Sequence, residues 1–187
     1  MEQAEMGLWE NEKILWEGKR GRFRLLERGV RKIILGKWMG TAAACAAVVG
    51  LYVTDQPAWN TGVVALTVLA ALYVMLDPVQ EWDSLQGQRY YLTDRRAVMV
   101  DEDGEVYAMD LDELDGFSTV EVDGGTCLVL GSSIRDQAAG QPRWYGCHPQ
   151  AECRRGERDG HIVGMVFYGL ENVGGAVECL HRRRGAA

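Results

Sequence analysis

The runs WMGTAAACAAVVGLYVT (Trp38–Thr54) and AWNTGVVALTVLAALYVML (Ala58–Leu76) contain no charged residue, and only Asp55, Gln56 and Pro57 separate them. A helix needs about 17–25 predominantly apolar residues to cross the hydrocarbon layer of a bilayer. Each run therefore predicts a membrane span, and the short polar turn predicts that the two spans form an antiparallel hairpin in residues 38–76. The alternative is a buried hairpin in a water-soluble protein, but neither run has a polar face to offer to water.

Charge is distributed unevenly around this hairpin. Residues 1–37 carry nine Lys/Arg and six Asp/Glu, whereas residues 77–187 carry eleven Arg and twenty Asp/Glu. The part of the chain after the hairpin is therefore strongly acidic. Nucleic-acid binding relies on a basic surface that neutralises phosphates, so no nucleic-acid partner is expected.

Basic residues cluster just before the first span, and residues 1–37 are interpreted as a basic juxtamembrane segment. Basic residues that flank a span stay on the cytoplasmic side, so the pattern predicts a multi-pass protein with both termini in the cytoplasm. Each such side chain near anionic lipid contributes about 1 kcal/mol. Alternatively, these basic residues only set the membrane topology and have no preference for a particular lipid. The lipid-surface candidates are Lys19, Arg20, Arg22, Arg24, Arg28, Arg31 and Lys32.

After the hairpin the periodicity changes to short β-rich stretches punctuated by turn signals such as Asp103-Gly104. Residues 132–160 are polar and predict a long loop, with a faint seventh strand at Arg143–Cys147. The six clearer strands are expected at Arg89–Leu92, Ala97–Val100, Val106–Met109, Phe117–Val122, Cys127–Leu130 and Ile162–Tyr168.

The chain is expected to end in one amphipathic helix. Leu170, Val173, Val177 and Leu180 recur at helical spacing, with Ala176 beside them. The predicted fold class is therefore α+β, with a two-helix transmembrane hairpin followed by antiparallel β-structure and a C-terminal helix.

Three segments carry a resemblance to a known family. YYLTDRR (Tyr90–Arg96) resembles the Y-x-L-T-x-x-R opening of the bacterial pleckstrin-homology (PH) domain family, and FYGLENV (Phe167–Val173) resembles its closing strand and helix. EKILWEG (Glu12–Gly18) is similar to the segment that precedes the membrane spans in that family.

This resemblance covers roughly residues 8–181. It implies a PH-like antiparallel β-barrel capped by the C-terminal helix, in a cytoplasmic domain over residues 81–187 behind two spans in the cytoplasmic membrane of a bacterium. It also implies a membrane-associated interaction module, and it offers no catalytic residues to carry over.

Metal and catalytic motifs give little support for an enzyme. Cys147, His148, Cys153 and His161 offer nitrogen and sulfur ligands for zinc, which would suit a zinc-dependent membrane enzyme. Their spacing matches no common zinc knuckle, and thiols left reduced in the cytoplasm are the simpler interpretation. No G-x-S-x-G elbow surrounds a serine. We therefore expect no catalytic residue, no metal and no cofactor.

The leading hypothesis from the sequence is a non-enzymatic inner-membrane protein whose cytoplasmic PH-like domain binds a protein or peptide partner, or a second copy of the chain. The alternative is a membrane sensor that binds anionic lipid through residues 19–32. Membrane lipids are expected partners in both cases.

Overall fold

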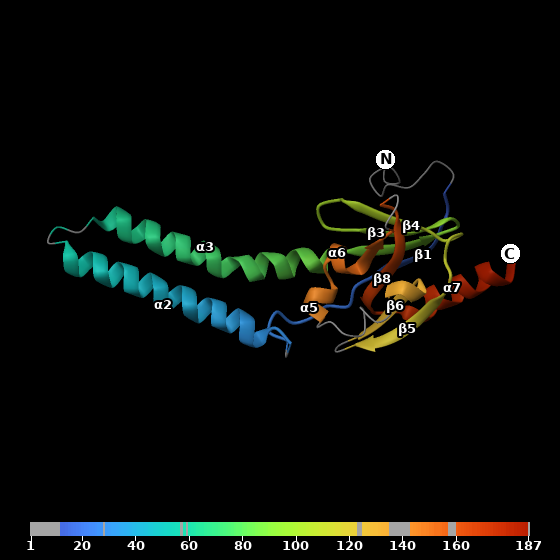
Figure 1. Ribbon diagram of the computed structural model, residues 1–187, viewed down its shortest axis with the longest axis horizontal. Coiled ribbons are helices and arrows are strands. Elements are labelled where there is room, and N and C mark those ends of the chain that lie inside the picture. The colour runs from blue at the N-terminus through green and yellow to red at the C-terminus, as the bar shows by residue number, and fades with distance from the viewer. Residues whose placement is uncertain are drawn as a thin grey trace. The chain divides into compact units, whose positions relative to one another are not determined.

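The computed structural model describes residues 12–27, 29–56, 58, 60–122, 125–134, 143–156 and 160–186 (Figure 1). The chain forms two compact units. The helical unit is Arg24–Asp83, and the β-rich unit combines the residues up to Phe23 with those from Ser84 onward. The α+β class is confirmed. Residues 1–37 are not a separate segment, because their first part belongs to the β-rich unit and the helical unit is inserted into it.

The helical unit contains two long apolar helices, α2 (Arg31–Asp55) and α3 (Thr61–Gln86), of which the last turn of α3 belongs to the β-rich unit. Both are long and apolar enough to cross a membrane, and only 6% of the most apolar window of each helix is buried. Leu51 is 71% exposed and Leu66 is 70% exposed. This exposure contradicts the alternative of a hairpin buried inside a soluble protein.

The helices α2 and α3 run antiparallel (Figure 1), and side-chain contacts between them set their register. The indole Nε1 of Trp38 donates to the backbone carbonyl of Met75 at 2.9 Å, and Lys37 forms an ion pair with Asp77. Pro78 lies inside α3, where it removes one helical hydrogen bond. The indole bond and the ion pair therefore join the helices beside the point where α3 is weakened.

The first sheet of the β-rich unit has the antiparallel order β1-β2-β3-β4. The strands predicted for β2, β3 and β4 are confirmed, and β1 was not predicted. Gly104 supports the predicted turn between β3 and β4 with a φ of 81°, a left-handed conformation that favours glycine. The bounds are β1 Ile14–Lys19, β2 Arg89–Thr93, β3 Arg96–Val100 and β4 Val106–Asp110.

The second sheet has the antiparallel order β5-β6-β8-β7. A single bridge between Arg20 and Leu170 joins the two sheets at one corner, and Gly21 N–H donates to the carbonyl of Gly169 at 2.8 Å. The described strand pairings leave two open sheets and do not close a barrel. The bounds are β5 Phe117–Val122, β6 Gly125–Leu130, β7 Cys153–Arg155 and β8 Ile162–Leu170.

The core lies between the two sheets and the C-terminal helix α7 (Val173–Ala186). Tyr90 and Leu92 enter it from β2, Phe167 from β8, and Leu180 from α7. The helix prediction is confirmed from Val173 onward, whereas Leu170 ends β8. Tyr90 and Leu92 alternate along β2 as expected for side chains on one face of a sheet, and the intervening Tyr91 is also buried, so this strand is covered on both faces.

The stretch 132–160 contains regular structure, so the predicted long loop is wrong for its described part. The predicted strand at Arg143–Cys147 is a helical turn. Gly146 allows this turn to approach β8, because a Cβ there would lie 2.5 Å from the ring of Tyr168. Residues 135–142 and 157–159 lie outside the described residues. The elements are η1 (Ser132–Ile134), α5 (Arg143–Gly146), α6 (Pro149–Glu152) and β7.

Candidate functional site

A surface pocket of about 380 Å³ lies between α7 and the connection from β4 to β5. Its apolar side chains are Leu111 and Leu180, which are nearly buried, and the half-buried Leu114 and Phe117. Asp112, Arg183 and Arg184 complete the lining. The pocket therefore combines an apolar surface with a charged rim.

The two arginines of this pocket have different surroundings. Arg183 donates to the carbonyls of Leu111 at 2.8 Å and Asp94 at 3.3 Å, and it pairs with Asp112. Its charge is therefore engaged in holding α7 against the sheets.

Arg184, by contrast, stacks on the ring of Phe117 with its Cζ 5.2 Å from the ring centroid, and it donates to the carbonyl of Asp115 at 3.2 Å. Among the described residues no carboxylate pairs with Arg184. Because a guanidinium has five donors, most of them stay available to a carboxylate from outside.

A second pocket, of about 370 Å³, also adjoins α7 and shares Arg183 with the first. Its charges are balanced within the chain, since Arg182 pairs with Glu178 one helical turn away at 3.5 Å and Arg183 is already engaged. The first pocket is therefore better suited to an anionic ligand.

The predicted lipid-surface residues differ in their exposure in the structure. Lys19, Arg22, Arg24, Arg31 and Lys32 are exposed, and none of them forms an ion pair within the described part of the chain. Arg28 lies outside the described residues. Arg20 was wrongly placed in this group, because its side chain is completely buried and its charge is neutralised inside the domain.

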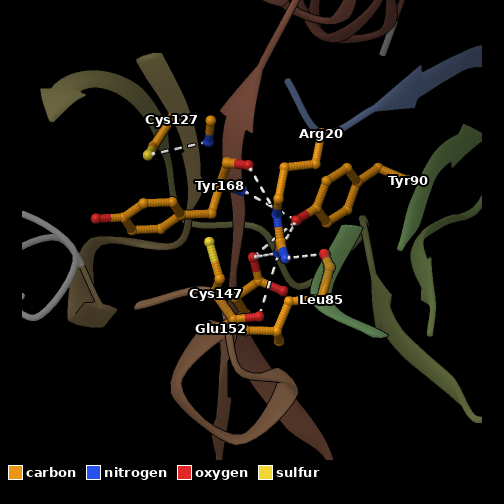
Figure 2. Close-up of polar contacts among 8 residues, drawn as sticks. Arg20, Leu85, Tyr90, Cys127, Cys147, Glu152 and Tyr168 are labelled. Carbon is orange, nitrogen blue, oxygen red and sulfur yellow. Dashed lines mark hydrogen bonds and ion pairs between the residues drawn. The ribbon is translucent and has the colours of Figure 1, made fainter. Parts of the chain in front are cut away.

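Figure 2 shows how Arg20 is held in the interior of the β-rich unit. Its guanidinium pairs with Glu152, donates to the hydroxyl of Tyr90, and donates to the carbonyls of Leu85 at 2.7 Å, Cys147 at 3.2 Å and Tyr168 at 3.3 Å. Tyr90 in turn donates to Glu152 Oε1 at 2.7 Å. Every donor group of the guanidinium thus faces an acceptor.

The carboxylate of Glu152 is less completely satisfied. Its Oε2 is buried and has no hydrogen-bond partner in the described structure. Burial raises the pKa of Glu152 to about 7, although Arg20 and the Tyr90 hydroxyl oppose this rise. Burial also raises the pKa of Tyr90 well above its ordinary value. Burial alone would lower the pKa of Arg20, but Glu152 and Tyr90 reverse that effect and keep the guanidinium cationic.

A second buried ion pair joins two of the segments on which the family resemblance rests. Glu12 Oε2 accepts from Arg96 at 2.6 Å, and Glu12 Oε1 accepts from Arg96 Nε at 3.0 Å and from the Thr93 hydroxyl at 2.7 Å. The threonine and second arginine of YYLTDRR therefore bind the first residue of EKILWEG. This contact fixes β1 at the edge of the first sheet.

The four residues weighed as zinc ligands do not form a common site. Cys147 is fully buried, whereas His161 is exposed. Within the described residues, no group of three His, Cys, Asp or Glu side chains is arranged to hold a metal ion.

Sequence reasoning missed both the pocket and the partners of Arg20. The Arg182–Arg184 run in an acidic domain was a usable signal for the pocket rim. The sequence contained no such signal for Glu152, because this residue lies 132 positions from Arg20 in the chain.

Comparison with known proteins found no matching family model, no matching curated protein and no matching solved structure.

Proposed function

We propose that this chain is a non-enzymatic membrane protein whose β-rich unit is a PH-like domain that binds a peptide segment of a protein partner at the membrane. The pocket beside α7 is the binding site, and the peptide presents a carboxylate next to an apolar side chain. The carboxylate binds Arg184, and the apolar side chain contacts Leu114 and Phe117.

The observation that carries this proposal is the charge of Arg184 beside an apolar pocket, which no carboxylate of the described residues neutralises. Arginine binds carboxylates with two parallel hydrogen bonds, and its stacking on Phe117 orients the guanidinium in advance. The remainder of the domain carries many acidic side chains, which repel an acidic peptide elsewhere and favour this position.

The exposed apolar surfaces of α2 and α3 support the membrane location. The most apolar windows of both helices are almost entirely unburied, and such surfaces are costly in water. In the proposed topology the two helices span the cytoplasmic membrane of a bacterium and both termini lie in the cytoplasm. The series of antiparallel strands followed by α7 supports the PH-like assignment, as an open pair of sheets.

Site-specific photocross-linking in intact cells tests the pocket. A photoreactive amino acid at Leu114 is expected to form adducts, and the same group at Thr119, an exposed residue of β5 outside the pocket lining, serves as the matched control. Mass spectrometry of the adducts is expected to identify a segment with an acidic residue beside an apolar one.

The charge of Arg184 provides the second arm of this test. The variant Arg184→Glu is expected to abolish the Leu114 adduct, because it replaces the cation with a like charge. Equal adducts at Leu114 and Thr119, or an adduct that survives Arg184→Glu, would refute peptide binding at this pocket.

A second candidate function is binding of anionic lipid by the basic residues before and at the start of α2. It is favoured by the exposure of Arg22, Arg24 and Arg31 and by their lack of ion pairs in the described structure. Reversal of these three charges is expected to remove anionic lipid that co-purifies with the full chain, as measured by lipid mass spectrometry. Unchanged lipid content would reject this function.

A further inference from the structure

The first described residues of the chain lie close to the pocket beside α7. Lys13 N–H donates to Asp94 Oδ1 at 3.0 Å, and the carbonyl of Lys13 accepts from the N–H of Asp94 at 3.0 Å. Arg183, which lines the pocket, donates to the carbonyl of the same Asp94 at 3.3 Å. A single residue therefore links the start of the described chain to the rim of the pocket.

Strand pairing sets the distance between Glu12 and this pocket. Glu12 binds Arg96 at the start of β3, and Arg96 lies opposite Asp110 at the end of β4. The next residue, Leu111, donates its N–H to the carbonyl of Arg95 at 2.8 Å and lines the pocket. Three strand spacings of about 4.8 Å therefore place Leu111 about 14 Å from Glu12.

Residues 1–11 carry the chemistry that the pocket requires. They lie outside the described residues, and their sequence, MEQAEMGLWEN, has three glutamates and no lysine or arginine. Glu5 is followed by Met6, so that a carboxylate stands beside an apolar side chain. Arg184 offers this carboxylate a cation that no carboxylate of the described residues neutralises. The acidic remainder of the domain repels the segment from other positions.

The length of chain before Glu12 selects the glutamate that reaches Arg184. Glu5 lies seven residues before Glu12, and an extended chain of that length covers about 24 Å. This reach includes the distance to Leu111 and leaves about 10 Å to cross a pocket of about 380 Å³. Glu10, two residues before Glu12, covers only about 7 Å and stops short of the pocket. Glu2 needs a longer tether than Glu5, and the effective concentration falls with tether length.

We propose that residues 1–11 occupy the pocket beside α7 when no partner is bound, with Glu5 on Arg184 and Met6 against Leu114 and Phe117. The inference rests on the proposed function, because it gives the same peptide site an internal competitor. A segment tethered at this distance has an effective concentration of about 1 mM at the pocket. A partner peptide must displace it, so the segment raises the affinity that a partner needs.

Photocross-linking of the purified full chain in detergent tests the occupant. With a photoreactive amino acid at Leu114 and no other protein present, adducts are expected within residues 1–11, whereas the same group at Thr119 is expected to give none. In an equal mixture of ¹⁵N-labelled and unlabelled chains, each adduct is expected to join residues of the same label. Adducts of mixed label would identify a second copy as the occupant and overturn the proposal, and so would the absence of adducts.

Charge reversal tests the assigned contact. Glu5→Lys is expected to remove the Leu114 adduct, and Glu10→Lys, the same change of charge beyond reach of Arg184, is the matched control that keeps it. Arg184→Glu is expected to remove the adduct, and its combination with Glu5→Lys is expected to restore it, because the two charges are exchanged. An adduct that survives Glu5→Lys, or a pair of reversals without recovery, overturns the contact.

Binding of a synthetic peptide tests the competition. The probe is a fluorescent peptide of residues 1–11, titrated with the full chain in phosphatidylcholine nanodiscs and followed by anisotropy. If the free peptide binds the pocket with a Kd of about 0.1 mM, a competitor at about 1 mM makes the native chain bind it about tenfold more weakly than the Glu5→Lys chain. Glu10→Lys is expected to bind as the native chain does. Equal binding by the native and Glu5→Lys chains, or no binding by either, overturns the competition.

These outcomes separate the inference from the proposed function. If Leu114 forms adducts with a partner in cells but none with residues 1–11 in the purified chain, the internal competitor is refuted and peptide binding stands. If Leu114 forms adducts with residues 1–11 alone in both settings, the internal contact stands and the proposed binding of a partner fails.

Discussion

Glu12 and Arg96 are separated by 84 residues in the sequence and meet in a buried ion pair that holds β1 against the β2–β3 turn. Removal of one partner of such a pair leaves an uncompensated buried charge, which costs about 3–5 kcal/mol. We expect Arg96→Met to lower the free energy of unfolding by this amount in urea titrations followed by near-ultraviolet circular dichroism.

The neighbouring Arg95→Met is the matched control for this prediction. Arg95 is exposed, and we expect its replacement to change stability by less than about 0.5 kcal/mol. Equal effects of the two variants would show that the Glu12 contact contributes nothing specific.

The shape of the Arg20 side chain matters as well as its charge. In the native chain three different nitrogens of Arg20 reach the carbonyls of Leu85, Cys147 and Tyr168. Arg20→Lys keeps the cation, but its donors all lie on one nitrogen and cannot reach these separate positions together. Each buried acceptor left without a partner costs about 1–3 kcal/mol. We expect the variant to lose at least this much stability in the same urea titration, while the exposed Arg22→Lys remains close to the native chain. A stable Arg20→Lys would contradict the donor geometry.

At the scale of elements, the close approach of α5 to β8 depends on a residue without a side chain. An added Cβ at Gly146 would lie 2.5 Å from the ring of Tyr168, so Gly146→Ala must displace α5 or the ring. Overpacking of this kind costs about 1–3 kcal/mol. We expect a matching drop in the thermal unfolding midpoint. Gly185→Ala in α7, where no atom beyond the adjacent residues and the local helix backbone lies within 4 Å of the new Cβ, is expected to change it little.

The register of α2 against α3 can be checked in the native chain with a carbodiimide, which joins an amine to a carboxylate in direct contact. We expect an amide cross-link between Lys37 and Asp77 in peptide mass spectra, because these side chains form an ion pair. Asp77→Asn is expected to remove it. A link from Lys37 to Glu81 instead would mean that the register is shifted by one helical turn.

Elements whose residues form continuous patterns were predictable from the sequence. Six of the seven described strands after the hairpin, and α7, follow alternating or helical spacing and were confirmed within a few residues; the three-residue β7 was not predicted. β1 was not recognised, because it is short, lies among charged residues and pairs with a strand on the far side of the hairpin. α5 and α6 were not recognised, because each is a single turn with no periodicity to detect.

The candidate sites were predictable only in part, for the same reason. Arg22 and Arg31 are exposed, as their position in a basic run suggests, and their role at a lipid surface stays a prediction. Arg20 sits in the same basic run, yet its role is set by Glu152, a residue 132 positions away. Long-range pairing of this kind is invisible to any local pattern.

At the scale of the whole molecule, the insertion of the helical unit predicts which fragments fold. Ser84–Ala187 alone lacks β1, Glu12 and Arg20, so it leaves Arg96 and Glu152 without their partners. We expect this fragment to be disordered. Residues Glu12–Phe23 joined to Ser84 by a short Gly/Ser linker are expected to fold, since the Gln86 side chain already contacts the carbonyl of Phe23.

The measurement is the dispersion of amide proton shifts in solution without detergent. A folded Ser84–Ala187 fragment, or an unfolded linked version, would contradict the assignment of β1 to this domain. The linked version also lacks most of the exposed apolar surface of α2 and α3, so comparing its solubility with that of the full chain measures how far those helices limit solubility in water.

The position of β1 ahead of α2 has a consequence for biosynthesis. A ribosome delivers this strand first, yet its partner β2 emerges only after both apolar helices have been made. During that interval the strand has no sheet to join, and its buried ions have no counterions. The first sheet of the domain can therefore form with β1 in place only after both apolar helices have been synthesised.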